Sequence, residues 1–184
     1  ILYAADRDGQ IWYINVKDKS SPQVVQRIRV VELHRPITAI SFLAGGISLL
    51  VGDSHGRITQ WFPKRDPNNS QVLIKVRDFH DQQAPILAIA PEERRKGFVA
   101  ADNTGQLGLY HATAHRTVLV KSISDTAITH LALAPRANTL LAEDAKGMLH
   151  LWNIHNEHPE ISWATLWHKT WYENYEKPEY IWQS

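Results

Sequence analysis

The sequence predicts an all-β fold made of repeated units. Four Asp-x-x-Gly tetrapeptides recur along the 184 residues, and their glycines, Gly9, Gly56, Gly105 and Gly147, are 47, 49 and 42 residues apart. Short apolar runs separated by turn residues surround each tetrapeptide, and no long helical periodicity occurs before residue 160. Short strands at regular spacing indicate an all-β architecture, and a period of this length indicates propeller blades or another stacked array.

Each tetrapeptide is expected to form a tight turn between two strands. An aspartate side chain can accept hydrogen bonds from nearby backbone amides, and glycine adopts the positive φ that other residues resist. The structural turn residues are therefore Asp6 and Gly9, Asp53 and Gly56, Asp102 and Gly105, and Asp144 and Gly147.

A complete unit is expected to hold four strands. The strands before the turns, at residues 47–51, 97–101 and 139–142, are almost continuously apolar, as expected for strands covered on both faces. Preceding strands are expected at 37–42, 86–90 and 128–133, and more polar outer strands at 24–33, 71–79 and 117–123. The predicted organisation is a partial first blade at 1–33, three blades at 34–79, 80–124 and 125–160, and an aromatic-rich tail at 161–184.

These repeats resemble WD40 repeats, in which a histidine before the innermost strand pairs with the aspartate of the later turn. His34 precedes Asp53 by 19 residues and His80 precedes Asp102 by 22, so the resemblance implies that both are structural blade histidines. Asp125 stands where a third histidine would be, and the closing Trp-Asp dipeptide of the family is replaced by Trp61-Phe62, Tyr110-His111 and Trp152-Asn153. The repeats are degenerate.

The first unit has no innermost strand, so the chain holds about three and a half four-stranded blades. Closed propellers use four to eight blades. We therefore expect a WD40-like β-propeller fragment with an incomplete ring, cut from a longer protein that supplies further blades before Ile1. Exposed blade edges make self-association of this form an expectation as well.

The tail has a different character, with seven large aromatic residues between Trp163 and Trp182. Residues 161–171 can be an outer strand of the last blade. Tryptophan and tyrosine also favour the boundary between water and bilayer, so a connection next to a membrane is the other interpretation. Its interface aromatics would be Trp167, Trp171, Tyr172, Tyr175, Tyr180 and Trp182.

Residues 167–175 and 178–184 resemble the segment that leads into the membrane helices of phosphate-type ABC transporter permeases. Some of these permeases carry a large soluble insertion outside the cytoplasm. The resemblance implies a periplasmic domain of a bacterial inner-membrane protein, with a regulatory or docking role in phosphate uptake. Its partners would be other transporter subunits or the remainder of the same permease chain.

Composition argues against several kinds of chemistry. A net charge of +1 is too small for a nucleic-acid-binding surface, and the absence of cysteine excludes disulfides and thiolate metal sites. His150, His155 and His158, or His111 and His115, have the best spacing for metal ligation, but surface histidines are the simpler interpretation. No nucleophile elbow, phosphate-binding loop or dinucleotide fingerprint occurs. We expect no cofactor and no catalytic or metal-binding residues.

Three classes of function follow from this pattern. The leading hypothesis is a non-catalytic propeller domain of a phosphate-type permease that acts through protein contacts. The alternative is a freestanding cytoplasmic scaffold of WD40 type, whose tail is an ordinary strand and helix. A propeller hydrolase or lyase would need polar side chains that converge in the central channel.

Overall fold

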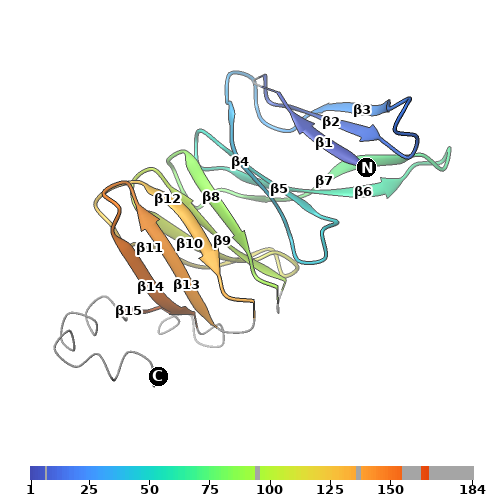
Figure 1. Cartoon of the computed structure of the whole chain (residues 1–184). Coiled ribbons are helices and arrows are strands. Elements are labelled where there is room, and N and C mark those ends of the chain that lie inside the picture. The colour runs from blue at the N-terminus through green and yellow to red at the C-terminus, as the bar shows by residue number, and fades with distance from the viewer. Residues whose placement is uncertain (7, 94–95, 136–137, 155–162, 166–184) are drawn as a thin grey trace.

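In the part of the chain that the structure describes, fifteen β-strands form four antiparallel sheets (Figure 1). The computed structural model describes residues 1–6, 8–93, 96–135, 138–154 and 163–165. Within these residues there is no helix. The first sheet contains β1 (Leu2–Ala5), β2 (Gln10–Asn15) and β3 (Gln23–Arg29); the second contains β4 (Ile37–Phe42), β5 (Leu49–Asp53), β6 (Ile58–Arg65) and β7 (Gln71–Phe79); the third contains β8 (Ile86–Pro91), β9 (Gly97–Asp102), β10 (Gln106–His111) and β11 (Arg116–Ser122); the fourth contains β12 (Ile128–Leu133), β13 (Thr139–Asp144), β14 (Leu149–Ile154) and β15 (Trp163–Thr165).

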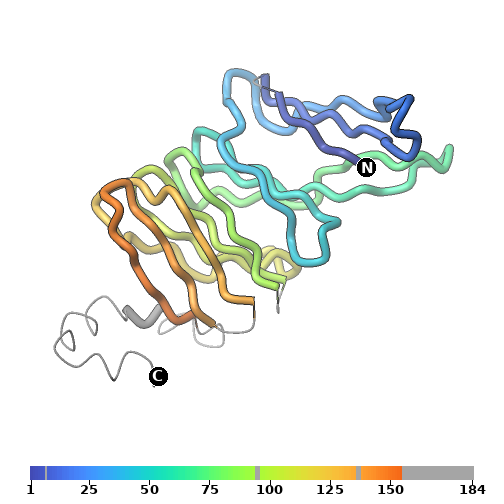
Figure 2. Tube along the Cα trace, viewed as in Figure 1, coloured from blue at the N-terminus to red at the C-terminus, as the bar shows by residue number. Residues whose placement is uncertain are grey.

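The sheets follow one another in chain order, each packed face to face on the next (Figures 1 and 2). Three apolar clusters fill the spaces between them. Ile11 and Tyr13 of the first sheet meet Leu49 and Trp61 of the second. The next two clusters join the second sheet to the third and the third to the fourth in the same way. Each core is therefore shared between neighbouring sheets.

The strands before the turns are apolar because a neighbouring sheet packs on each of their two faces. Every residue of β5 and β9 is buried, because consecutive side chains on a strand point to opposite faces and both faces carry a neighbouring sheet. In β13 the buried positions alternate with partly exposed ones. This alternation indicates that, among the described residues, only one face of the fourth sheet is covered.

The strand order is the one expected from the repeats. Each of the last three sheets runs from an inner strand (β4, β8 or β12) to an outer strand (β7, β11 or β15) in sequence order. The first sheet has three strands and begins with β1, which stands in the position of β5, β9 and β13. The tail contributes β15, paired antiparallel with β14. The interface aromatics proposed at 167–182 lie outside the described residues.

Candidate functional site

The four turn aspartates make one hydrogen-bonding pattern. In each, Oδ1 accepts bonds from the backbone amides two and four residues later, over 2.8–3.1 Å. The glycine that follows has φ between +77° and +85°. The aspartate oxygen and the two amides that bond to it lie within five consecutive residues. This part of the turn therefore forms locally, and it is the same in all four units.

The second carboxylate oxygen, Oδ2, differs in its hydrogen bonding from one unit to the next. Asp102 Oδ2 accepts a bond of 3.2 Å from Gln82 Nε2. Asp144 Oδ2 accepts one of 2.9 Å from the Ser124 hydroxyl. Both donors stand 20 residues before their aspartate, in the connection that enters the sheet. This oxygen therefore ties the connection to the turn.

The donor position is occupied by Leu33 in the second sheet, 20 residues before Asp53. Leucine has no donor, and its side chain is 64% exposed. Asp53 itself is 1% exposed, and its Oδ2 is a buried oxygen that finds no hydrogen-bond partner among the described residues. A buried acceptor without a donor costs about 1–3 kcal/mol, so the Asp53 turn lacks a stabilising bond that the third and fourth sheets have.

The two expected histidine pairings are wrong. His34 is exposed and has φ +64°, and it makes no bond to Asp53. His80 is 63% exposed, and its Nε2 lies 3.0 Å from Asp78 Oδ1, while Gln82 takes the place at Asp102. In the third and fourth sheets the residue 20 positions before the aspartate reaches its carboxylate, and neither histidine occupies that position.

Two further side chains complete these networks. The Tyr110 hydroxyl donates to Gln82 Oε1 over 3.0 Å, so Gln82 bridges Tyr110 and Asp102 in the interior. His150 Nε2 lies 3.0 Å from Asp144 Oδ2. Burial would raise the pKa of Asp144, but hydrogen bonds from His150, Ser124 and two backbone amides hold it well below its ordinary value. The carboxylates of the turns therefore serve the fold.

In the described part of the chain, no three histidine or carboxylate groups lie close enough together to hold a metal ion. Of the three histidines expected to have ligand spacing, His150 contacts Asp144. His155 and His158 lie outside the described residues. No helix in the described ranges is long and apolar enough to cross a membrane.

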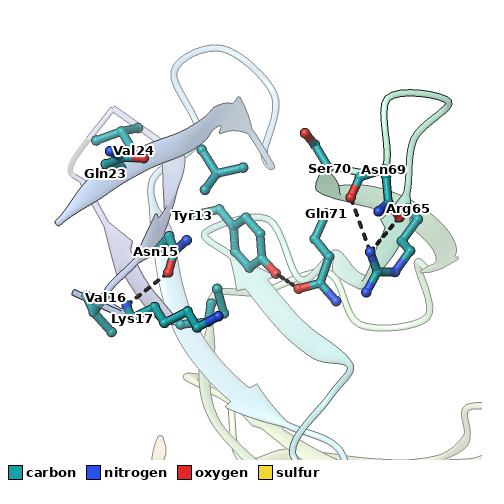
Figure 3. A pocket seen from close by; sticks show the side chains of 12 residues that line it. Tyr13, Asn15, Val16, Lys17, Gln23, Val24, Arg65, Asn69, Ser70 and Gln71 are labelled. Carbon is teal, nitrogen blue, oxygen red and sulfur yellow. Dashed lines mark hydrogen bonds between the residues drawn. The ribbon is translucent and has the colours of Figure 1, made fainter.

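An open cleft of about 940 Å³ lies between the first two sheets (Figure 3). Its walls come from the hairpins β2–β3 and β6–β7. Lys17 and Arg65 supply positive charge, and no carboxylate is found among its described lining residues. Val24 and Val25 add exposed apolar surface beside these cations.

Side-chain hydrogen bonds join the two sheets beside the cleft. The Tyr13 hydroxyl donates to Gln71 Oε1 over 2.9 Å, as Figure 3 shows. Gln26 bonds both backbone groups of Leu73, accepting from its amide at 2.6 Å and donating to its carbonyl at 3.3 Å. Because these hydrogen bonds join the two hairpins, the cleft exists without a bound ligand. Sequence reasoning missed these residues.

Comparison with known proteins places the fold. No family model matches the sequence, and no curated protein matches it. Among solved structures, Sqt1 of Chaetomium thermophilum, a WD40 β-propeller protein, is similar at TM-score 0.67 with 17% identity over 82% of this chain. The same protein bound to the N-terminus of the ribosomal protein L10 is similar at TM-score 0.67 with 16% identity over 82% of this chain. The chain spans 40% and 42% of the length of these two structures. It has the fold of part of a WD40 β-propeller.

Proposed function

We propose that the chain is a non-catalytic protein-interaction module that binds an extended polypeptide segment in the cleft between its first two sheets. The cleft is the observation that carries this proposal. It is preformed, about 940 Å³ in volume, and combines two cations with exposed valines. A segment that carries carboxylates beside apolar side chains complements it in charge and in hydrophobicity.

The fold supports a scaffold of this kind. A propeller presents loops and hairpins from several sheets on a rigid frame, so that side chains distant in sequence form one surface. Sqt1, which shares the fold, is described in complex with the N-terminus of a ribosomal protein. This supports the freestanding WD40-like scaffold better than the transporter subunit.

Peptide selection with matched variants tests the proposal. A displayed random peptide library is selected on the chain, and the recovered peptides are measured against a variant that carries Lys17→Glu and Arg65→Glu. We expect the recovered peptides to be acidic and to lose binding to this variant. The control carries Lys96→Glu and Arg116→Glu, which make the same charge change on the third sheet, outside the cleft. Peptides that bind both variants as well as the parent chain would refute the assignment.

Placement in a phosphate-type permease remains a second proposal, supported by the resemblance of residues 167–175 and 178–184 to the segment before the membrane helices of that family. In that setting the module lies on the periplasmic side of the bacterial inner membrane, and the bound segment belongs to a transporter subunit. The sequence that follows Ser184 in the gene tests it, because membrane helices there support the permease and a further blade supports the freestanding scaffold.

A further inference from the structure

A side chain of the first sheet already occupies part of the outer edge of β7. Gln26 of β3 reaches across to this strand, where its Oε1 accepts from the Leu73 amide over 2.6 Å and its Nε2 donates to the Leu73 carbonyl over 3.3 Å. One residue of an added antiparallel strand would exchange the same two bonds with Leu73. The Gln26 carboxamide therefore takes the place of a main-chain partner.

The register of β6 on β7 locates the next free main-chain position on this edge. Leu73 lies opposite Pro63, which has no N–H, and its main chain points away from β6 to Gln26. Opposed pairs in an antiparallel ladder alternate between bonded and non-bonded, and no register shift occurs between Leu73 and Gln71. Gln71, which lies opposite Arg65, therefore directs its amide and carbonyl to the same outer edge as Leu73.

Gln71 also lies in the cleft between the first two sheets. It lines this cleft together with Val24 and Val25 of β3, which are 53% and 38% exposed. The Tyr13 hydroxyl donates to the Gln71 side chain over 2.9 Å, as Figure 3 shows. Arg65, the partner of Gln71 across the ladder, lines the cleft as well. Free main-chain groups, a positive charge and apolar surface therefore meet at one level of the cleft.

We propose that the cleft binds its partner segment as an extended strand, one residue of which exchanges two main-chain hydrogen bonds with Gln71. This inference rests on the function proposed above and specifies how the segment is held. The main-chain bonds at Gln71 supply affinity for any sequence. Carboxylates and apolar side chains of the segment select the sequence through Lys17, Arg65 and the two valines. Because Gln26 occupies the following position, the added ladder stops before Leu73.

Hydrogen exchange measured by NMR tests this mode of binding. The probe is the acidic peptide that binds most tightly in the library selection, synthesised with blocked termini and added to saturation. We expect exchange of the Gln71 amide to slow by at least about tenfold, while the Val72 amide, which points to β6, changes little. Binding that leaves the Gln71 amide unprotected would overturn this inference and leave the proposed function standing. If no acidic peptide binds in the cleft, both are overturned.

N-methylated peptides give a second measurement that leaves the protein unchanged. Each peptide carries one N-methyl group, which removes a single main-chain donor. We expect methylation of the residue opposite Gln71 to weaken binding by about tenfold, and methylation of the residues on either side of it to have a smaller effect. An equal loss at every position, or no loss at any position, would contradict strand addition.

The variant Gln26→Ala removes the side chain that occupies the edge at Leu73. We expect the Leu73 amide to exchange faster in the free variant, because it loses its bond to Gln26. When the peptide is bound, the segment can continue along the edge, so the Leu73 amide should regain its protection. A Leu73 amide that still exchanges fast in the complex would show that the segment does not follow β7, and would overturn the inference.

Discussion

Replacing Gly56 with alanine is expected to destabilise the protein far more than replacing Gly147. The two glycines have φ +83° and +77°, so alanine loses about 1–2 kcal/mol of backbone free energy at either position. At Gly56 the added Cβ would lie 2.8 Å from the backbone nitrogen of Gln83 and closer still to the carbonyl of Gln82. At Gly147 it would meet nothing within 4 Å.

The difference arises because the Asp53 turn packs on the connection between β7 and β8. That connection is backbone, and moving it adds an overpacking cost of about 1–3 kcal/mol. We therefore expect a loss of about 2–5 kcal/mol for Gly56→Ala, against about 1–2 kcal/mol for Gly147→Ala.

Urea denaturation, followed by tryptophan fluorescence and by circular dichroism, measures both losses. Gly105→Ala should behave like Gly56→Ala, because its Cβ would lie 2.6 Å from the carbonyl oxygen of Thr126 in the next connection. Equal losses at Gly56, Gly105 and Gly147 would refute the reasoning, since they would show that the turns do not bear on the neighbouring sheet.

Three further changes probe the turn networks. Asp144→Asn should destabilise at neutral pH, and its difference from the parent chain should shrink as pH falls below about 4, because a carboxylate with a lowered pKa loses its stabilisation on protonation; unfolding free energies at pH 7 and pH 3 measure this, and a constant difference would contradict it. Tyr110→Phe removes the donor to buried Gln82 Oε1 and should cost about 1–3 kcal/mol in urea denaturation; a change near zero would show that this bond contributes nothing. Leu33→Gln supplies a donor for Asp53 Oδ2 and should raise the urea midpoint by the equivalent of about 0.5–1.5 kcal/mol, whereas His34→Gln should not; equal effects would refute the 20-residue rule.

The repeating turns made the fold predictable from sequence. Each turn depends on one aspartate, one glycine and amides within four residues. The turn can therefore be recognised from a short sequence pattern. The apolar strands before the turns were equally visible, because burial on both faces leaves no polar alternation. Inner strands were predicted at 37–42, 86–90 and 128–133, and they form at almost the same residues.

The donor to Oδ2 could not be predicted by residue type. Glutamine, serine and leucine occupy the same position in three connections, so no shared letter marks it. The unequal spacings of His34 and His80, 19 and 22 residues, were a signal that these residues are not equivalent. Only a constant distance of 20 residues identifies the position, and that distance becomes meaningful once Gln82 and Ser124 are seen to point inward.

The sequence gives only a weak indication of the cleft, namely the length of one hairpin. β6 and β7 span eight and nine residues, while β10 and β11 span six and seven, so the second sheet has the longer outer hairpin. Its extra length extends the wall that carries Arg65 and Asn69, about 50 residues from the facing wall in sequence. Sequence patterns describe single sheets well, but a cleft between two sheets depends on how far each hairpin projects.

The residue directly before each turn aspartate differs between the first three sheets and the fourth. Ala5, Gly52 and Ala101 stand directly before their turn aspartates, and each is small or lacks a side chain. Ile86 packs on Gly52, where an added Cβ would lie 2.8 Å away, and Ile128 belongs to the same core as Ala101. The corresponding residue of the fourth sheet is Glu143, whose carboxylate lies 3.3 Å from His130 Nδ1.

An isoleucine from a further inner strand could not pack there without displacing or burying that charge, and an isolated buried carboxylate is costly. The small residues before the turns of the second and third sheets thus make room for the inner strand of the next sheet. The charge at Glu143 therefore distinguishes the fourth sheet from the first three, in which the residue before the turn is alanine or glycine.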